Sequence, residues 1–451
     1  MLQRKFLGFL EEWRSSSGRK PLVVKGQRQV GKTYIIREFA KTYPHHVELN
    51  FIENPRLKDI FDDSLDTESL ISRMKLFFDP SEFVPGFTLI FIDEIQECAK
   101  ARTSLKWFAE SGIYDVVASG SMLGIVDNMS GQGESIPVGY EQTVEMKALD
   151  FEEFLVARGI SRDSISEVRR CLSNRSEIPK AFLSVFEGHF RDYMVVGGMP
   201  AAVQRFVDTN DYMAAREVVL DLVQSARSDI NRYNVGVNRI KSGECYDSIP
   251  YQLGHTNKKF MYSRITGEGS RKSAEKYMDN LLWIRSAGYA IFCYALTGIG
   301  LPSAMYVDRS SFRVYLSDTG TLTNLYGTGS IKAILSSDHS YNMGAVAENA
   351  VADCLVKAGF TPMYYRKTGG DDRMELDFLI ETPAGLTVIE VKSGKTREAP
   401  SINKLRSDAV FKRIMLREGN VADEGNGIMG YPLFAAAFID EICGSADALF
   451  D

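Results

Sequence analysis

Apolar runs and amphipathic stretches alternate along the first 150 residues of the chain. Each run has the length of one strand, and the stretches between them repeat apolar residues at helical spacing. Strands that alternate with helices predict an α/β fold built on a parallel sheet. The predicted strands are residues 21–25, 47–52, 88–96 and 114–118. Helical stretches are predicted at residues 1–17 and 57–78, and a further helical pattern follows the first strand and ends at residue 40.

The segment after the first predicted strand reads GQRQVGKT and fits the phosphate-binding motif GxxxxGK[ST]. Its two glycines let the backbone turn tightly, so that N–H groups and a helix N-terminus point at the phosphates of a nucleotide. Lys32 then reaches the β- and γ-phosphates, and the Thr33 hydroxyl ligates Mg²⁺. The motif predicts ATP and Mg²⁺ as ligands, with an ordinary glycine-rich turn as the alternative. The predicted nucleotide-binding residues here are Gly26, Gln27, Arg28, Gln29, Val30, Gly31, Lys32 and Thr33.

Two carboxylates, Asp93 and Glu94, end the apolar run TLIFIDEIQ at residues 88–96. A buried parallel strand would deliver them at its carboxyl edge, where open α/β sheets bind ligands. Asp93 is predicted to hold Mg²⁺ through water, and Glu94 to act as the catalytic base that polarises the attacking water. The alternative is a strand that ends in two solvated acids, which the upstream phosphate-binding loop disfavours.

Helical patterns fill residues 151–235, which we interpret as a helical lid. Residues 197–200 (GGMP) predict a tight turn between two helices, residues 212–233 predict a long amphipathic helix, and residues 234–248 read as a loop. Residues 258–296 then follow the order of a short helix, a turn, a helix and an apolar strand. This order resembles a winged helix.

The winged-helix-like stretch is basic, although the chain carries a net charge of −6. Such a cluster could neutralise DNA phosphates, and a solvated helix face is the alternative. DNA is therefore a predicted partner. The basic residues are Lys258, Lys259, Arg264, Arg271, Lys272, Lys276 and Arg285.

The C-terminal third combines acidic residues with one lysine on a predicted helix and hairpin. Residues 344–357 predict a helix that carries Glu348, and residues 374–380 predict a strand that contains Asp377. A turn at residues 381–385 leads into the strand 386–392, which places Glu390 and Lys392 on one face. We place Glu375 on the opposite face of its strand and outside the site.

Asp377, Glu390-x-Lys392 and Glu348 resemble the active-site set of the PD-(D/E)xK nuclease fold. The resemblance implies Mg²⁺ held by Asp377 and Glu390, with Glu348 as an outer ligand and Lys392 positioning the attacking water. Glu390 and Lys392 are then catalytic. The alternatives are a strand with exposed charges, or a fold that is kept while catalysis is lost.

Five segments together resemble a family of bacterial and archaeal AAA-type ATPases that carry a C-terminal restriction-endonuclease-like domain. They are GQRQVGKT, LIFIDEIQ, ASGSMLGI, LDFEEFL at residues 149–155 and YMVVGGMPAAV at residues 193–203. The resemblance implies ATP hydrolysis and a sensor of the γ-phosphate at Ser119 or Ser121, a small-residue turn being the alternative. The family has Gly-Arg where this chain has Gly139-Tyr140. Arginines that lie further on are Arg158, Arg169, Arg170 and Arg175.

Size and composition extend this picture. A chain of 451 residues exceeds one ordinary core, and its 44% hydrophobic and 25% charged residues are typical of a globular protein. Six separated cysteines without a CxxC pair predict reduced thiols. The N-terminal residues lack a long apolar segment, so we expect a cytoplasmic protein without membrane contact. We predict an ATPase domain at 1–150, a lid at 151–235, a winged-helix-like region at 236–300 and a nuclease-like domain at 301–451.

Two functions from different classes fit these patterns. One is an ATP-hydrolysing switch or motor coupled to a nuclease-like domain that engages DNA. The other is a nucleotide-controlled interaction protein whose C-terminal domain is a silent docking module. A metabolic P-loop kinase fits less well, because the Asp93-Glu94 pair favours phosphate release to water. A homo-oligomer or a partner protein is a further prediction.

Overall fold

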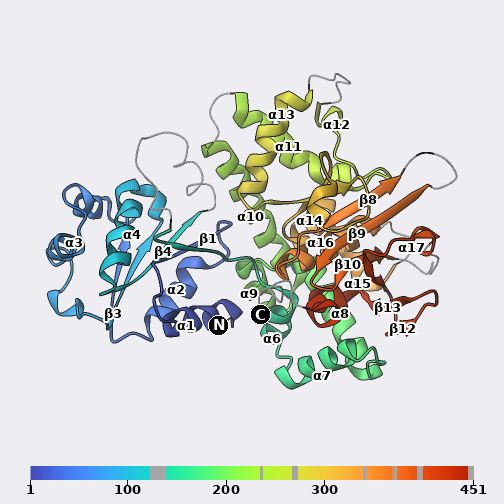
Figure 1. Cartoon of the computed structure of the whole chain (residues 1–451), viewed down its shortest axis with the longest axis horizontal. Helices are drawn as coiled ribbons and strands as arrows, with labels where there is room; N and C mark the ends of the chain where they lie inside the picture. The colour runs from blue at the N-terminus through green and yellow to red at the C-terminus, as the bar shows by residue number, and fades with distance from the viewer. Residues whose placement is uncertain are drawn as a thin grey trace. The chain divides into compact units, whose positions relative to one another are not determined.

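The computed structural model describes residues 2–121, 139–233, 237–266, 273–338, 343–367, 369, 373–393 and 400–444. The chain forms two compact units (Figure 1). The first unit comprises residues 3–148 with 286–288, and the second comprises residues 1–2, 149–285 and 289–451. The predicted domain boundaries at residues 150, 235 and 300 stay predictions.

The first unit is built on a five-stranded parallel sheet with the order β2-β3-β4-β1-β5. The predicted α/β class is therefore observed in this unit. Its elements are α1 (Lys5–Ser15), β1 (Leu22–Gly26), α2 (Lys32–Ala40), β2 (His45–Asn50), η1 (Pro55–Phe61), α3 (Thr67–Met74), η2 (Pro80–Glu82), β3 (Thr88–Asp93), η3 (Ile95–Glu97), α4 (Ala99–Ser111), β4 (Asp115–Ser121) and β5 (Gln142–Glu145).

Helices cover both faces of this sheet. Alternate strand residues such as Val23, Ile90 and Val116 form one core with apolar residues of α3 and α4. Residues between them, such as Val24 and Phe91, are equally buried and lie on the other face of their strands. Helix α2 contacts β1, β3 and β4. This layering holds the carboxyl ends of the strands in fixed positions.

Helices dominate the first half of the second unit. The prediction of a loop at residues 234–248 is wrong, because helix α11 begins at Val237. Its apolar pattern is weak, because polar Ser242 and Gln252 are among its buried residues, and it contains Pro250. Cys245, Ile249 and Leu253 are nevertheless buried at helical spacing. Tertiary packing therefore decides this helix. The helices are α6 (Phe151–Ala157), α7 (Arg162–Ser173), α8 (Lys180–Val196), α9 (Pro200–Thr209), α10 (Tyr212–Tyr233), α11 (Val237–Leu253), α12 (Ser263–Thr266) and α13 (Ser273–Ser286).

The second half of this unit carries an eight-stranded mixed sheet with the order β12-β13-β11-β10-β9-β8-β6-β7. Its elements are β6 (Ala290–Leu296), η4 (Ser303–Tyr306), β7 (Val307–Leu316), α14 (Thr319–Tyr326), α15 (Thr328–Ser336), α16 (Gly344–Lys357), β8 (Met363–Lys367), β9 (Met374–Thr382), β10 (Gly385–Val391), α17 (Pro400–Lys404), β11 (Val410–Arg417), β12 (Ala422–Asp423), β13 (Ile428–Pro432), η5 (Leu433–Phe438) and α18 (Ile439–Cys443).

Strand β6 corrects the winged-helix prediction. It pairs antiparallel with β7 and parallel with β8, so the strand expected to close a winged helix belongs to the C-terminal sheet. The boundary at residue 300 would cut this sheet between β6 and β7. Pairing partners this far away in the sequence are invisible to a local pattern.

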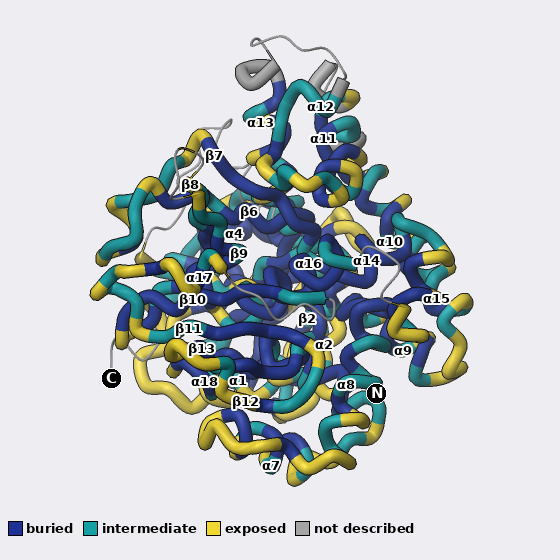
Figure 2. Tube along the Cα trace, turned by 90° about the vertical axis from the view of Figure 1, so that its right-hand side faces the viewer, coloured by how far each residue is buried: buried dark blue, intermediate teal, exposed yellow. Residues whose placement is uncertain are grey.

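The predicted hairpin is present, since β9 pairs antiparallel with β10. Strands β10, β11 and β13 run parallel, so their carboxyl ends meet at one edge. Ile402 of α17 packs with Leu386 and Val388 of β10. Helix α16 is buried over most of its length, whereas α7 exposes many residues (Figure 2).

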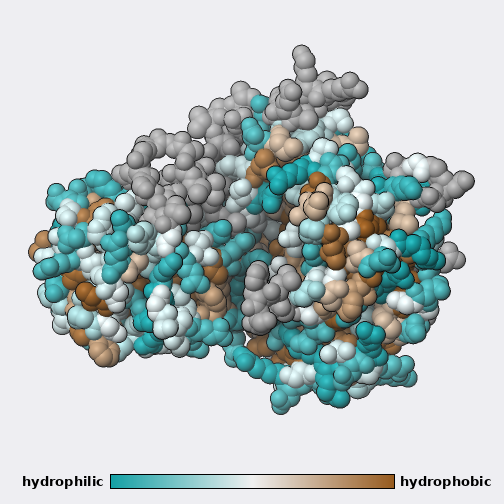
Figure 3. Space-filling model, viewed as in Figure 1, coloured by the Kyte–Doolittle hydropathy of each residue, from teal (hydrophilic) through white to brown (hydrophobic). Residues whose placement is uncertain are grey.

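The surface is mixed in character. Figure 3 shows hydrophobic residues in small groups among hydrophilic ones on the face that it draws. The cysteines, Cys98, Cys171, Cys245, Cys293, Cys354 and Cys443, are all free and buried, as predicted. Among the described residues, no helix combines the length and the apolar character that crossing a bilayer requires.

Candidate functional site

The loop between β1 and α2 has the backbone of a tight phosphate-binding turn. Gly31 has φ +94° and Gln29 has φ +64°, both in the left-handed region. A Cβ atom added to Gly26 would lie 2.3 Å from the carbonyl oxygen of Met146. Glycine is therefore required at residue 26 by the close approach of the chain that follows β5.

Lys32, at the start of α2, lies over this loop. Its Nζ donates hydrogen bonds to the carbonyl oxygens of Gly26 at 3.0 Å and Gln27 at 2.9 Å. Burial lowers the pKa of Lys32 to about 8, although the charges of Glu94 and Asp93 favour its protonated form. The ammonium group is thus held beside the loop where the motif predicts phosphates.

Asp93, at the end of β3, is the centre of a polar cluster. The Thr33 hydroxyl donates to both of its oxygens, at 3.1 and 3.2 Å. The Ser119 hydroxyl donates to Oδ1, and the Asn50 side chain donates to Oδ2 at 3.2 Å. Burial raises the pKa of Asp93, against the effect of the bond from Ser119. Strands β2 and β4, which flank β3, therefore each bring a polar side chain to the carboxylate of Asp93.

These oxygens suit a hard divalent cation. A threonine hydroxyl and a carboxylate are ligands that Mg²⁺ accepts, and Mg²⁺ keeps water and phosphate oxygens for the rest of its shell. Thr33 and Asp93, predicted from positions sixty residues apart, lie within hydrogen-bond distance. The residues present fit the predicted cation.

Glu94 adopts an unusual backbone conformation directly after β3. Its φ is +52°, which is rare for a residue other than glycine. The Gln96 side chain donates a hydrogen bond to Glu94 Oε2. A strained residue that a neighbour holds in place is typical of a functional position. Gln96 was not predicted, because its role depends on the turn that η3 makes.

Of the two sensor candidates, Ser119 donates a hydrogen bond to Asp93. Ser121 lies two residues further along β4 and pairs in register with Gly26. Asn50 was missed, although it ends β2 in register with Asp93. The predicted strand at residues 47–52 placed Asn50 inside the strand and so concealed it.

Three of the four arginines considered for a catalytic role have partners within the second unit. Arg158 donates to Asn210 at 2.7 Å, Arg169 to Glu152 at 2.6 Å and Arg170 to Glu167 at 2.6 Å. Tyr140 stands where the resembling family has arginine. The ammonium nitrogen of Lys106 lies 5.4 Å from the centroid of the Tyr140 ring. A role for an arginine in hydrolysis therefore stays untested.

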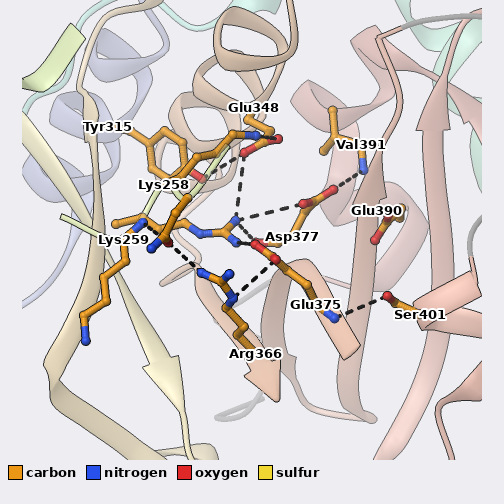
Figure 4. Close-up of polar contacts among 12 residues, drawn as sticks. Lys258, Lys259, Tyr315, Glu348, Arg366, Glu375, Asp377, Glu390, Val391 and Ser401 are labelled. Carbon is orange, nitrogen blue, oxygen red and sulfur yellow. Dashed lines mark hydrogen bonds and ion pairs between the residues drawn. The ribbon is translucent and has the colours of Figure 1, made fainter. Parts of the chain in front are cut away.

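The acidic residues of the C-terminal third surround a buried arginine that the sequence analysis missed. Arg313 of β7 has a side chain that is 1% exposed. Its guanidinium lies 2.5 Å from Glu375, 3.9 Å from Glu348 and 4.0 Å from Asp377. Figure 4 shows these three carboxylates directed toward one point from α16 and β9. Although burial lowers the pKa of Arg313, Tyr315, Glu348 and Asp377 raise it overall.

Further cations and donors complete this cluster. Lys258 forms an ion pair with Glu348, and the Tyr315 hydroxyl donates to the same carboxylate at 3.3 Å. Arg366 lies 3.5 Å from Glu375 (Figure 4). The placement of Glu375 on the opposite face is wrong. It is two residues from Asp377, so the period of a strand directs both to one side.

Glu390 and Lys392 lie beside this cluster on the next strand. Lys392 Nζ donates to Glu390 Oε1 at 2.8 Å, whereas Glu390 Oε2 is buried and has no hydrogen-bond partner among the residues that the structure describes. Burial, and then the charge of Asp377, raise the pKa of Glu390 to about 7. Burial and Asp377 also raise the pKa of Glu348. Asp377 accepts a hydrogen bond from the Val391 N–H at 3.0 Å.

The metal set of Glu348, Asp377 and Glu390 stays a prediction. Within the described ranges, no three histidine, cysteine, aspartate or glutamate side chains are arranged to hold a metal ion. Arg313 and Lys258 lie against Glu348, and Lys392 lies against Glu390, so these acids take part in ion pairs within the protein. We derive no metal-dependent step from the set.

Three of the seven residues of the predicted basic cluster have partners within the protein. Lys258 pairs with Glu348, Arg264 donates to the Asn257 carbonyl at 3.0 Å, and Arg285 donates to the Tyr294 hydroxyl at 3.1 Å. Lys259 is exposed. Arg271, Lys272 and the side chain of Lys276 lie outside the described residues.

The parallel sheet, the glycine loop and the acidic strand end are similar to those of an AAA domain. Residues 18–155 match the family model described as AAA domain. Residues 187–332 and 343–434 match two models described as domains of unknown function, DUF8612 and DUF4143. A comparison with curated proteins finds no match.

Similar solved structures include several ATPases. The Walker-type ATPase of Pyrococcus abyssi is 13% identical, with a TM-score of 0.41 over 72% of this chain and 96% of that chain. The ORC2 protein of Aeropyrum pernix is 12% identical, with a TM-score of 0.36, and the match covers 75% of this chain and 96% of that chain. The RuvB Holliday junction branch migration motor of Thermotoga maritima is 14% identical, with a TM-score of 0.26, and the match covers 63% of this chain and 87% of that chain.

Proposed function

We propose that this protein binds ATP with Mg²⁺ and hydrolyses it as a conformational switch. The observation that carries the proposal is the contact of Thr33 with Asp93 beside the loop covered by Lys32. Mg²⁺, when bound, would neutralise phosphate charge. In this assignment Lys32 binds the phosphates, and Thr33 and Asp93 hold the cation.

Glu94 is the proposed base. It lies one residue beyond the cation ligand, and Gln96 holds one of its oxygens. The other oxygen can then accept a proton from the water that attacks the γ-phosphate. Ser119 is a positioning residue, because its hydroxyl fixes the orientation of Asp93.

Two substitutions test these roles separately. Lys32→Ala is expected to abolish nucleotide binding, because it removes the cation that meets the phosphates. Glu94→Gln is expected to keep ATP binding and to reduce hydrolysis at least a hundredfold, within the range assigned to a general base. Fluorescent-nucleotide titration and phosphate release measure the two steps. Hydrolysis by Glu94→Gln at the wild-type rate would refute the assigned base.

The ion-pair network around Arg313 favours one function for the second unit. Its carboxylates are neutralised by protein cations, which supports a nucleotide-controlled interaction module rather than a metal-dependent nuclease. Cleavage of single-stranded, duplex or branched DNA by the pure protein with Mg²⁺ or Mn²⁺ would contradict this assignment.

DNA binding, self-assembly and a partner protein stay predictions of this proposal. A gel shift at several salt concentrations tests DNA, because phosphate contacts make binding weaken as salt rises. Lys259→Glu is the informative charge reversal, since Lys259 is exposed. Lys258→Glu would also break the ion pair with Glu348 and cannot separate binding from folding.

A further inference from the structure

A cavity of about 340 Å³ lies within the second unit, and its described lining residues all belong to that unit. Its floor includes Lys392 and Arg417, which follow or end the neighbouring parallel strands β10 and β11. The carboxyl ends of parallel strands are where α/β sheets bind ligands. The volume is that of a pocket for a small molecule, and a nucleic-acid duplex is far larger.

One part of the cavity wall is apolar. Phe190 and Met194 come from α8, Ile334 from α15, Val346 from α16 and Leu433 from η5. Helices from distant parts of the sequence therefore enclose a surface suited to the hydrocarbon or aromatic body of a ligand.

Three cations line the same cavity. Arg417 is compensated by Glu424, and Lys392 donates to Glu390 with one of its three N–H bonds. Arg191 of α8 makes no ion pair within the described part of the chain. Glu187, Asp338 and Glu418 also line the cavity, and Asp338 and Glu418 take part in further interactions. The donors left available are those of Lys392 and Arg191.

We propose that this cavity binds a small organic anion. Its apolar body would lie between α8, α15 and α16, and its anionic group would accept hydrogen bonds from Lys392 and Arg191. Lys392 would then serve ligand binding rather than cleavage of nucleic acid. The proposal is independent of ATP hydrolysis, because every residue in it belongs to the second unit.

The probe for this site is 1-anilinonaphthalene-8-sulfonate, which joins two aromatic groups to one sulfonate. We expect saturable fluorescence enhancement with one probe per chain in the wild-type protein. Lys392→Met keeps the apolar stem and removes the charge, so the probe should bind at least tenfold more weakly. The neutral analogue N-phenyl-1-naphthylamine should bind equally to both proteins.

A second variant tests the location of the site. Ala347 lines the cavity, and Ala347→Phe should fill it and abolish saturable binding. Ala181→Phe adds the same bulk at an exposed residue of α8 and should leave the affinity unchanged. Circular dichroism establishes that each variant is folded, and Lys392→Met decides the question if Ala347→Phe is not.

Several outcomes would overturn the proposal. They are the lack of saturable binding by the wild type, an unchanged affinity in Lys392→Met, an unchanged affinity in folded Ala347→Phe, and an equal loss in Ala181→Phe.

Discussion

Single side chains decide how the nucleotide site is held. The carboxylate of Asp93 receives hydrogen bonds from Thr33, Ser119 and Asn50, which leaves it little freedom to rotate. A ligand held in this way presents its oxygens to a cation without further ordering. The same contacts separate two serines that the sequence analysis treated alike.

We predict that Ser119→Ala slows ATP hydrolysis more than Ser121→Ala. Removing the Ser119 hydroxyl frees Asp93 to rotate, and losses of 10- to 100-fold are typical when a residue supporting a metal ligand is lost. Phosphate release at several Mg²⁺ concentrations measures the effect. Equal rates for the two variants would show that the contact of Ser119 with Asp93 has no catalytic consequence.

Glu390 makes stability depend on pH. Its folded pKa of about 7 lies above the ordinary value of 4.5, so the native state binds more protons than the unfolded state between these values. The free energy of unfolding therefore falls as pH rises from 4.5 to 7. We predict that Glu390→Gln removes this fall and stabilises the protein at pH 8, by about 1 to 3 kcal/mol. Urea unfolding at pH 5 and pH 8 measures it.

Glu177→Gln is the matched control for this prediction, because Glu177 is exposed in the same unit. It should leave the pH dependence unchanged. A Glu390→Gln variant that stays as pH-dependent as the wild type would contradict the assignment.

At the scale of elements, β7, β9 and α16 are joined through one buried guanidinium. Arg313 contacts carboxylates from both other elements, so its charge is what allows these acids to be buried together. The hairpin and the helix could be predicted locally. Their common partner could not, because Arg313 precedes Asp377 by more than sixty residues and its strand carries no nuclease-like pattern.

We predict that Arg313→Met destabilises the second unit by about 3 to 5 kcal/mol, the cost of leaving a buried charge unpaired. Chemical unfolding followed by circular dichroism measures this change. Arg366→Met is the control, because the side chain of Arg366 is 25% exposed and water can compensate its loss. Equal effects of the two variants would show that burial of Arg313 is not decisive.

At the scale of the whole molecule, two compact units with separate cores predict two unfolding transitions. ATP with Mg²⁺ should raise the free energy of unfolding of the first unit alone, by about 2.7 kcal/mol at a hundredfold excess over the dissociation constant. The transition temperature of the first unit should therefore rise, and that of the second unit should not change. Scanning calorimetry measures both transitions. Lys32→Ala should remove the shift, and a shift of both transitions in the wild type would contradict the assignment of the nucleotide to the first unit.

The sequence by itself determined the features that depend on neighbouring residues. The P-loop, the helix with Glu348 and the hairpin of β9 and β10 follow from local spacing, because turn geometry and strand periodicity act over a few residues. The period of two also places Glu375 beside Asp377, and this could have been predicted correctly.

Only the tertiary structure decided what distant segments do together. Packing makes α11 a helix although its apolar pattern is weak, and strand pairing assigns β6 to the C-terminal sheet rather than to a winged helix. Chain folding also brings Asn50 to Asp93 and Arg313 to Glu348. These contacts depend on burial and charge balance in three dimensions, which residue spacing does not encode.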